Sequence, residues 1–174
     1  MPNEKKTNIV LIGMPASGKS TVGVILAKVL GMDFIDSDLV IQKREGARLN
    51  ELIEKYGVDD FMRREEAAIL GINVTNTVIA TGGSAVYSAA SMAHLAENSC
   101  IVYLKVELDV LKKRLSDIKG RGVVLRDGET LETIYETRAK LYEKYADITI
   151  EETGASVKNT IEDTVEDTVR GIIG

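Results

Sequence analysis

Length, composition and charge indicate one soluble globular domain. The chain has 174 residues, 44% of them hydrophobic and 28% charged, which suits a single domain with a sizeable core. Its net charge of −5 and pI near 5.1, with no basic run longer than Lys112–Arg114, argue against a nucleic-acid surface. The sequence shows neither a signal-type apolar start nor a stretch near the ~18 apolar residues of a membrane span. We therefore expect a cytoplasmic protein that acts on small molecules.

The first predicted elements are a strand and a helix on either side of a glycine-rich loop. Asn8–Ile12 is a strand candidate, and Gly13–Ser20 (GMPASGKS) fits the pattern G-x-x-x-x-G-K-[ST]. In such a loop, backbone N–H groups surround a phosphate and the next helix directs its positive end at the same point. Helical apolar spacing follows at Val22, Ile25, Leu26, Val29 and Leu30.

The loop therefore predicts a nucleoside triphosphate site rather than a plain glycine-rich turn. Lys19 is expected to reach the β and γ phosphates, and Ser20 to supply a hydroxyl to Mg²⁺. The other nucleotide-binding candidates of this segment are Gly13, Ala16, Ser17, Gly18 and Thr21.

A second strand candidate, Asp33–Ile35, is followed by Asp36, Ser37 and Asp38. Open α/β sheets bind ligands at the carboxyl ends of their strands, so both carboxylates can face one crevice there. The alternative is helix capping, in which Ser37 or Asp38 accepts from first-turn amides.

The rest of the chain continues the alternation of strands and helices. Strand candidates are Val78–Ala80, Ile101–Leu104 and Ile148–Ile150, and one helix shows Leu108, Leu111 and Leu115 at helical spacing. This alternation predicts a three-layer α/β fold with a five-stranded parallel sheet. Two stretches depart from it: residues 41–73, interpreted as two helical segments, and residues 119–129, a polar loop.

Three features predict packing rather than chemistry. Cys100 lies in an apolar run and is expected to be a buried thiol, while His94 is expected on a helix surface. Without a His/Cys cluster, a zinc site is not expected. A repeat of Glu-Asp-Thr-Val at 162–169 predicts a last helix whose apolar stripe is Val157, Ile161, Val165 and Val169.

Taken in order and spacing, these motifs resemble those of the shikimate kinases, within the nucleoside-monophosphate-kinase-like group of P-loop proteins. The resemblance spans nearly the whole chain. It implies one P-loop kinase domain over 1–174, with a helical acceptor-binding region at about 37–73 and a lid at about 117–130. Such a monomeric enzyme moves the γ-phosphoryl group of Mg-ATP to a hydroxyl of shikimate, giving shikimate 3-phosphate for aromatic amino acid biosynthesis. The residues that carry the resemblance are the phosphate loop, Asp36–Asp38, Phe61–Glu65, Gly82, Gly83, Arg114, Arg121, Arg138 and Leu141–Tyr142.

On the donor side, the resemblance implies that Asp36 holds Mg²⁺ through its water shell. Arg121, in a Gly-containing loop, would close over the phosphates and act with Lys19 on the developing charge. Arg114 would pack on adenine. The alternatives are a solvated loop arginine at 121 and an exposed helix cation at 114.

On the acceptor side, Asp38 would orient the acceptor hydroxyl and accept its proton. Gly82 and Gly83 would let the backbone approach the acceptor, and Arg138 would grip its carboxylate with a planar fork. The alternatives are a tight turn at the two glycines and an exposed i,i+4 ion-pair partner at Arg138.

The chain departs from the family pattern mainly around the acceptor. Met62 stands where relatives carry a second carboxylate-binding arginine. Arg63 and Arg64 follow it, but each helical step turns by about 100°, so neither inherits the role automatically. Losing one such interaction would cost roughly 1.5–3 kcal/mol. Further departures are Ala16 and Ser84 for glycines, and Gly122 and Lys140 for prolines.

The acceptor is therefore less constrained by the sequence than the donor. A different hydroxy acid such as homoserine or gluconate is the main alternative, because Arg138 could still bind its carboxylate in a less cationic pocket. A nucleotide-binding module that senses ATP without turning it over is an alternative of another class.

Overall fold

All five predicted strands form, and they pair in parallel. A computed structural model describes residues 6–115, 122–152, 162, 163, 166 and 170 of the chain. Its sheet has the order β2-β3-β1-β4-β5. The strands are β1 (Asn8–Ile12), β2 (Asp33–Asp36), β3 (Thr77–Ala80), β4 (Ser99–Val106) and β5 (Ile148–Glu152).

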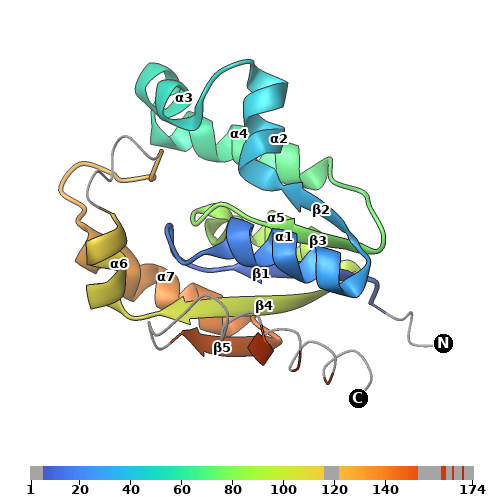
Figure 1. Ribbon diagram of the computed structural model, residues 1–174. Helices are drawn as coiled ribbons and strands as arrows, with labels where there is room; N and C mark the ends of the chain where they lie inside the picture. The colour runs from blue at the N-terminus through green and yellow to red at the C-terminus, as the bar shows by residue number, and fades with distance from the viewer. Residues whose placement is uncertain (1–5, 116–121, 153–161, 164–165, 167–169, 171–174) are drawn as a thin grey trace.

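Helices cover both faces of this sheet (Figure 1). On one face, Ile9 and Leu11 of β1 pack against α1. On the other, Val10 and Ile12 join a cluster with residues of α5, α6 and α7. Both faces are buried at the central strands β1 and β3, which is why these two strands are mostly apolar. The predicted three-layer α/β fold is confirmed. The helices are α1 (Lys19–Leu30), α2 (Ser37–Glu45), α3 (Leu49–Tyr56), α4 (Val58–Leu70), α5 (Ala89–Glu97), α6 (Leu108–Arg114) and α7 (Leu131–Tyr145), with a short 3-10 turn at Ala85–Tyr87.

The insertion after β2 contains three helices, so the prediction of two helical segments in 41–73 is wrong. Gly46 ends α2 at φ 69°, and Gly57, at φ 79°, separates α3 from α4. Glycine adopts such positive φ values without a Cβ clash. The three helices lie together on the β2 side of the molecule (Figure 1). Together with Val124 from the segment before α7, they enclose a small second core, formed by Ile41, Leu52, Phe61, Ala68 and Val124.

Helix α1 forms where the apolar spacing predicted a helix, but only part of that apolar set is buried. Ile25 and Val29 are 37% and 60% exposed, whereas Val22 and Leu26 are buried. Small residues explain the difference, because a Cβ at Gly23 would lie 2.7 Å from the Phe34 ring. The helix therefore approaches the sheet closely along its Gly23 face.

The remaining packing predictions have mixed outcomes. Cys100, Leu111 and Leu115 are buried as predicted. His94 is half-buried rather than on the surface, with its Nε2 2.8 Å from the carbonyl oxygen of Ile72. The predicted stripe at 157–169 falls outside the described residues. Among the residues that are described, no helix is long and apolar enough to cross a membrane.

Candidate functional site

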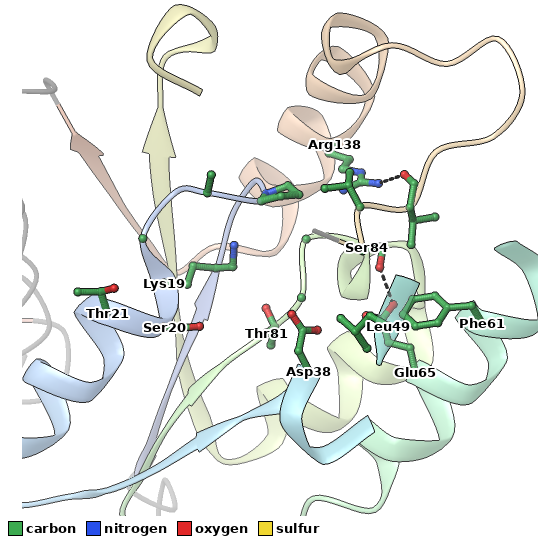
Figure 2. Close-up of a pocket in the computed structure, with 18 residues that line it drawn as sticks. Lys19, Ser20, Thr21, Asp38, Leu49, Phe61, Glu65, Thr81, Ser84 and Arg138 are labelled. Carbon is green, nitrogen blue, oxygen red and sulfur yellow. Dashed lines mark hydrogen bonds between the residues drawn. The ribbon is translucent and has the colours of Figure 1, made fainter. Parts of the chain in front are cut away.

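The ends of three neighbouring strands build one cavity. Asp36 of β2 and Leu11 of β1 both pair with Ala80 of β3, so the segments that leave these strands emerge side by side. The cavity of about 260 Å³ lies between these segments, α4 and α7. In Figure 2, Lys19, Asp38 and Glu65 face a common space, which Arg138 enters from the opposite side.

The phosphate loop has the backbone that anion binding requires. Gly13 and Gly18 have φ of 152° and 91°, and a Cβ at Gly13 would lie 2.7 Å from the Leu104 carbonyl oxygen. No side chain caps the first turn of α1, so its amides can serve an anion. Ala16 adopts φ 64° without being glycine, a conformation that costs about 1–2 kcal/mol.

Lys19 lies at the buried end of this loop. Its Nζ donates to the carbonyl oxygens of Gly13 and Met14, at 2.8 and 2.7 Å, and to Ser17 Oγ at 3.2 Å. Burial lowers the pKa of Lys19 to about 8, and Asp38 opposes that shift. The ammonium group therefore stays mostly charged at neutral pH, at the cavity end nearest the loop.

Ser20 and Asp36 meet at the exposed rim of the cavity. Ser20 Oγ donates to Asp36 Oδ2 at 2.6 Å, and Asp36 Oδ1 accepts from the Asp38 amide at 2.9 Å. Asp36 is thus the cap of α2, so the alternative that named Ser37 or Asp38 as the cap is wrong. Ser37 Oγ instead accepts from the Gly82 amide at 3.2 Å. The carboxylate of Asp38 is left to face the cavity.

This rim fits a magnesium ion better than a softer metal. Within the described part of the chain, no three His, Cys, Asp or Glu side chains gather into a cage. Mg²⁺ in phosphate sites is usually held by one or two carboxylates together with water and phosphate oxygens. A hydroxyl and a carboxylate that already touch at 2.6 Å are hard oxygen donors of that kind.

The pKa of the Asp38 carboxyl group is raised towards neutral pH. Burial raises its pKa to about 6, Asp36 adds to the shift and Lys19 opposes it. A Cβ at Gly82 would lie 2.6 Å from Asp38 Oδ1, and one at Gly83 would lie 2.6 Å from Pro15 Cδ. Neither glycine has a positive φ. Glycine is therefore needed at these two positions because neighbouring groups pack closely against the backbone around the cavity. A tight turn alone would not require this.

Arg138 is buried rather than an exposed ion-pair partner, so that alternative is wrong. It is 1% exposed, with Nη2 donating to Val124 O at 2.8 Å and Nε to the Tyr87 hydroxyl at 3.2 Å. Its Nη1 has no hydrogen-bond partner among the described residues. A buried charge with a spare donor at a cavity wall suits an anionic ligand group.

Glu65 is a site residue to which the sequence analysis assigned no role. It is 3% exposed, its Oε1 accepts from Ser84 Oγ at 2.8 Å, and its Oε2 has no partner within the described residues. Burial raises its pKa to about 7, against the effect of the Ser84 hydrogen bond. The signal was present, because Glu65 interrupts the apolar stripe of α4 formed by Phe61, Ala68 and Ile69.

Met62 and the two arginines after it do not line the main cavity. Met62 borders a smaller cavity of about 120 Å³. Arg63 is 74% exposed and pairs with Asp60. Arg64 binds Asp60 and Glu45 and lies over the Tyr56 ring. Neither Arg63 nor Arg64 therefore takes the place of the carboxylate-binding arginine that relatives carry at position 62.

The remaining predicted residues lie around the rim. Thr21, Ala16 and Gly18 line the cavity with Lys19 and Ser20. Arg114, at the end of α6, is half-buried and donates to Ala16 O at 3.1 Å, so it is more than an exposed helix cation. Arg121 and residues 116–120 lie outside the described residues. Gly122, at φ 69°, has a conformation that proline cannot adopt.

Known proteins match the chain along most of its length. The family model for shikimate kinase matches residues 15–169. A shikimate kinase of Actinobacillus pleuropneumoniae is 38% identical over 157 residues, covering 88% of this chain and 91% of that protein. One of Vibrio cholerae is also 38% identical, covering 88% and 90%.

Solved structures of shikimate kinases also match the chain. A shikimate kinase from Acinetobacter baumannii, in complex with shikimate, matches with a TM-score of 0.82 at 30% identity, covering 98% of this chain and 94% of that one. The enzyme from Aquifex aeolicus gives 0.76 at 30%, covering 96% of each chain. A gluconokinase from Sinorhizobium meliloti gives 0.58 at 20%, covering 97% and 93%, which shows a shared fold alone.

Proposed function

Because the chain belongs to the shikimate kinase family, we propose that it transfers the γ-phosphoryl group of Mg-ATP to a hydroxyl of shikimate. The main support for the proposal is that one cavity has two chemically different ends. Lys19 and the phosphate loop line one end, and Arg138 with its partnerless Nη1 lines the other. A phosphate donor and a carboxylated acceptor can therefore meet beside Asp38.

Each charged group then has one task. Lys19 would exchange its loop carbonyls for phosphate oxygens, and Ser20 and Asp36 would hold Mg²⁺, which when bound would neutralise phosphate charge. Asp38, ionised above its pKa of about 6, holds the acceptor hydroxyl in line and takes its proton. Phosphoryl transfer has a loose transition state, so this positioning matters more than strong basicity.

A second acceptor class has one specific observation in its favour. Glu65 Oε2 is buried without a partner in the described structure, and an ammonium group could donate to it. Homoserine offers an ammonium, a carboxylate and a hydroxyl. Gluconate has no cation to place there, and the gluconokinase similarity supports only the fold.

The test is acceptor-dependent ADP release with Mg-ATP. Shikimate, homoserine, gluconate and water alone form the panel, and the phosphorylated product is identified by mass spectrometry. Saturation by shikimate with a 1:1 yield of shikimate phosphate is expected. Tight ATP binding with no acceptor-dependent ADP would instead identify a nucleotide-sensing module.

The predicted acceptor region at about 37–73, the lid at about 117–130 and the monomeric state stay predictions. Sedimentation of the protein with and without nucleotide measures the last of these.

A further inference from the structure

A small cavity adjoins the main one at the position where the family's second arginine is missing. Its volume is about 120 Å³. It shares Val124 and Arg138 with the main cavity, so the same guanidinium borders both spaces. We call it the Met62 cavity, lined by Met62, Tyr87, Val124, Arg126, Glu129, Thr137 and Arg138.

Arg126 brings a second guanidinium to this place from a different element. Its Nη2 lies 4.0 Å from Met62 Sδ and 2.7 Å from Asp59 Oδ1. It follows the segment whose Val124 carbonyl accepts from Arg138, a bond drawn in Figure 2. A cation thus stands beside residue 62 although residue 62 is uncharged.

Arg138 alone cannot fill every acceptor site of a carboxylate. Its Nε and Nη2 already donate to Tyr87 and Val124, which leaves Nη1 as the guanidinium nitrogen without a partner in the described chain. A carboxylate has two oxygens and about four lone-pair sites. It therefore needs further donors, and a second arginine supplies them with charge assistance.

We propose that Arg126 is a specificity-determining residue that binds the acceptor's carboxylate together with Arg138, in place of an arginine at position 62. The proposal rests on the proposed function, since it deepens the recognition of a carboxylated acceptor at the same site. The carboxylate-binding role has moved from α4 to the segment before α7.

The ion pair that holds Arg126 is one that a ligand can replace. The side chains of Arg126 and Asp59 are 51% and 70% exposed, and exposed pairs contribute little to stability. Arg64, by contrast, is fixed between two carboxylates and over an aromatic ring. A ligand carboxylate beside Arg138 can therefore replace Asp59 as the partner of Arg126 at a small cost in free energy.

The experiment uses opposite expected effects within this one ion pair. Arg126→Ala should weaken acceptor binding, because one of the two guanidinium groups that bind the carboxylate is removed. Asp59→Asn should strengthen it, because Asp59 competes for Arg126. A purely structural ion pair would give effects in the same direction from either side. Arg63→Ala, which removes an exposed arginine from the residue next to Met62, is the matched control.

Two readouts separate this inference from the proposed function. ADP release gives kcat and KM for ATP, shikimate and shikimate methyl ester, which lacks the carboxylate charge. Calorimetric titration of shikimate gives binding without turnover. Arg126→Ala should raise KM and the dissociation constant for shikimate about tenfold. It should change the values for the ester and for ATP less than twofold, while Asp59→Asn lowers KM up to about fivefold.

Met62→Arg in the Arg126→Ala background should restore most of the shikimate affinity. Unchanged shikimate affinity in Arg126→Ala, equal losses for acid and ester, or a loss in Arg63→Ala instead would each overturn the inference while leaving the kinase activity standing. A wild-type protein that binds shikimate without phosphorylating it would overturn the proposed function alone. No binding of shikimate at all would overturn both.

Discussion

The donor side and the acceptor side of the cavity are built in different ways. On the donor side, Lys19 and its three hydrogen-bond acceptors all lie within residues 13–19. On the acceptor side, Asp38, Glu65, Gly82 and Arg138 come from α2, α4, the segment after β3 and α7. Two buried polar atoms there, Glu65 Oε2 and Arg138 Nη1, have no partner among the described residues.

Specificity can change more easily on the acceptor side than on the donor side. The phosphate-binding part of the donor side depends on backbone geometry and one lysine within a short loop, so few substitutions are compatible with it. The acceptor side depends on side chains from distant segments, so a charged group that is absent from one element can be supplied by another. Met62, Ser84 and Arg126 all lie at or beside that side.

The largest expected effect comes from Asp38→Asn, which tests whether the two sides work independently. The amide has the same size, but it carries no negative charge, can present an NH₂ donor to the acceptor hydroxyl and cannot take its proton. Both orientation and proton removal are lost, so kcat should fall by about 10²- to 10⁴-fold. ATP affinity, measured by nucleotide titration, should change less than about threefold. If the variant retained most of its turnover, Asp38 could not be the residue that orients the acceptor hydroxyl.

An intermediate effect concerns the buried carboxyl of Glu65. Its pKa is raised from 4.5 to about 7 in the folded chain, so the folded state holds its proton more tightly than the unfolded state. Between these pH values the unfolded chain ionises first, and the stability of the wild type should fall as pH rises. Relative to Glu65→Gln, the free energy of unfolding should drop by on the order of 3 kcal/mol from pH 4.5 to 7.

Denaturant unfolding at several pH values measures this difference. Asp38 titrates in an overlapping window in both proteins, and its charge also raises the pKa of Glu65, so the difference measures Glu65 together with this interaction. Glu54→Gln, at an exposed position of α3, controls for the loss of one charge. A difference between wild type and Glu65→Gln that stays constant with pH would mean that folding does not raise the pKa of Glu65.

The smallest expected effect is on the donor side. Arg114→Ala removes the bond to Ala16 O and a guanidinium surface for stacking on adenine, so KM for ATP should rise about two- to fivefold. KM for shikimate should not move. Lys113→Ala, which removes the adjacent exposed cation, is the matched control. A rise in acceptor KM instead would mean that the two sides are coupled through the loop.

Local sequence signals accounted for much of the fold and for the donor side. The run Asn8–Ile12, the loop with Lys19 and the strand near Asp36 were predicted because each lies within one short window, where period and glycine position carry the information. The third helix of the insertion was missed because a lone glycine, such as Gly46 or Gly57, does not show that it separates two helices rather than bending one.

The acceptor side needed the tertiary structure. The buried hydrogen bond from Ser84 to Glu65 joins residues that are 19 positions apart in the sequence. Arg126 contacts Met62, which is 64 positions away. No pattern along the chain specifies such distances, since they follow from how α4, α7 and the strand ends pack around one space.

The parallel sheet, the phosphate loop and the family could be predicted from the residues alone, because hydrophobic period, glycine positions and motif spacing are local properties of a chain. The different positions of the arginines became visible only in the folded chain: Arg138 is buried with a spare donor, Arg64 is held by two carboxylates, and Arg126 lies beside Met62. Burial and charge pairing are properties of neighbours in space, and those neighbours come from distant parts of the chain.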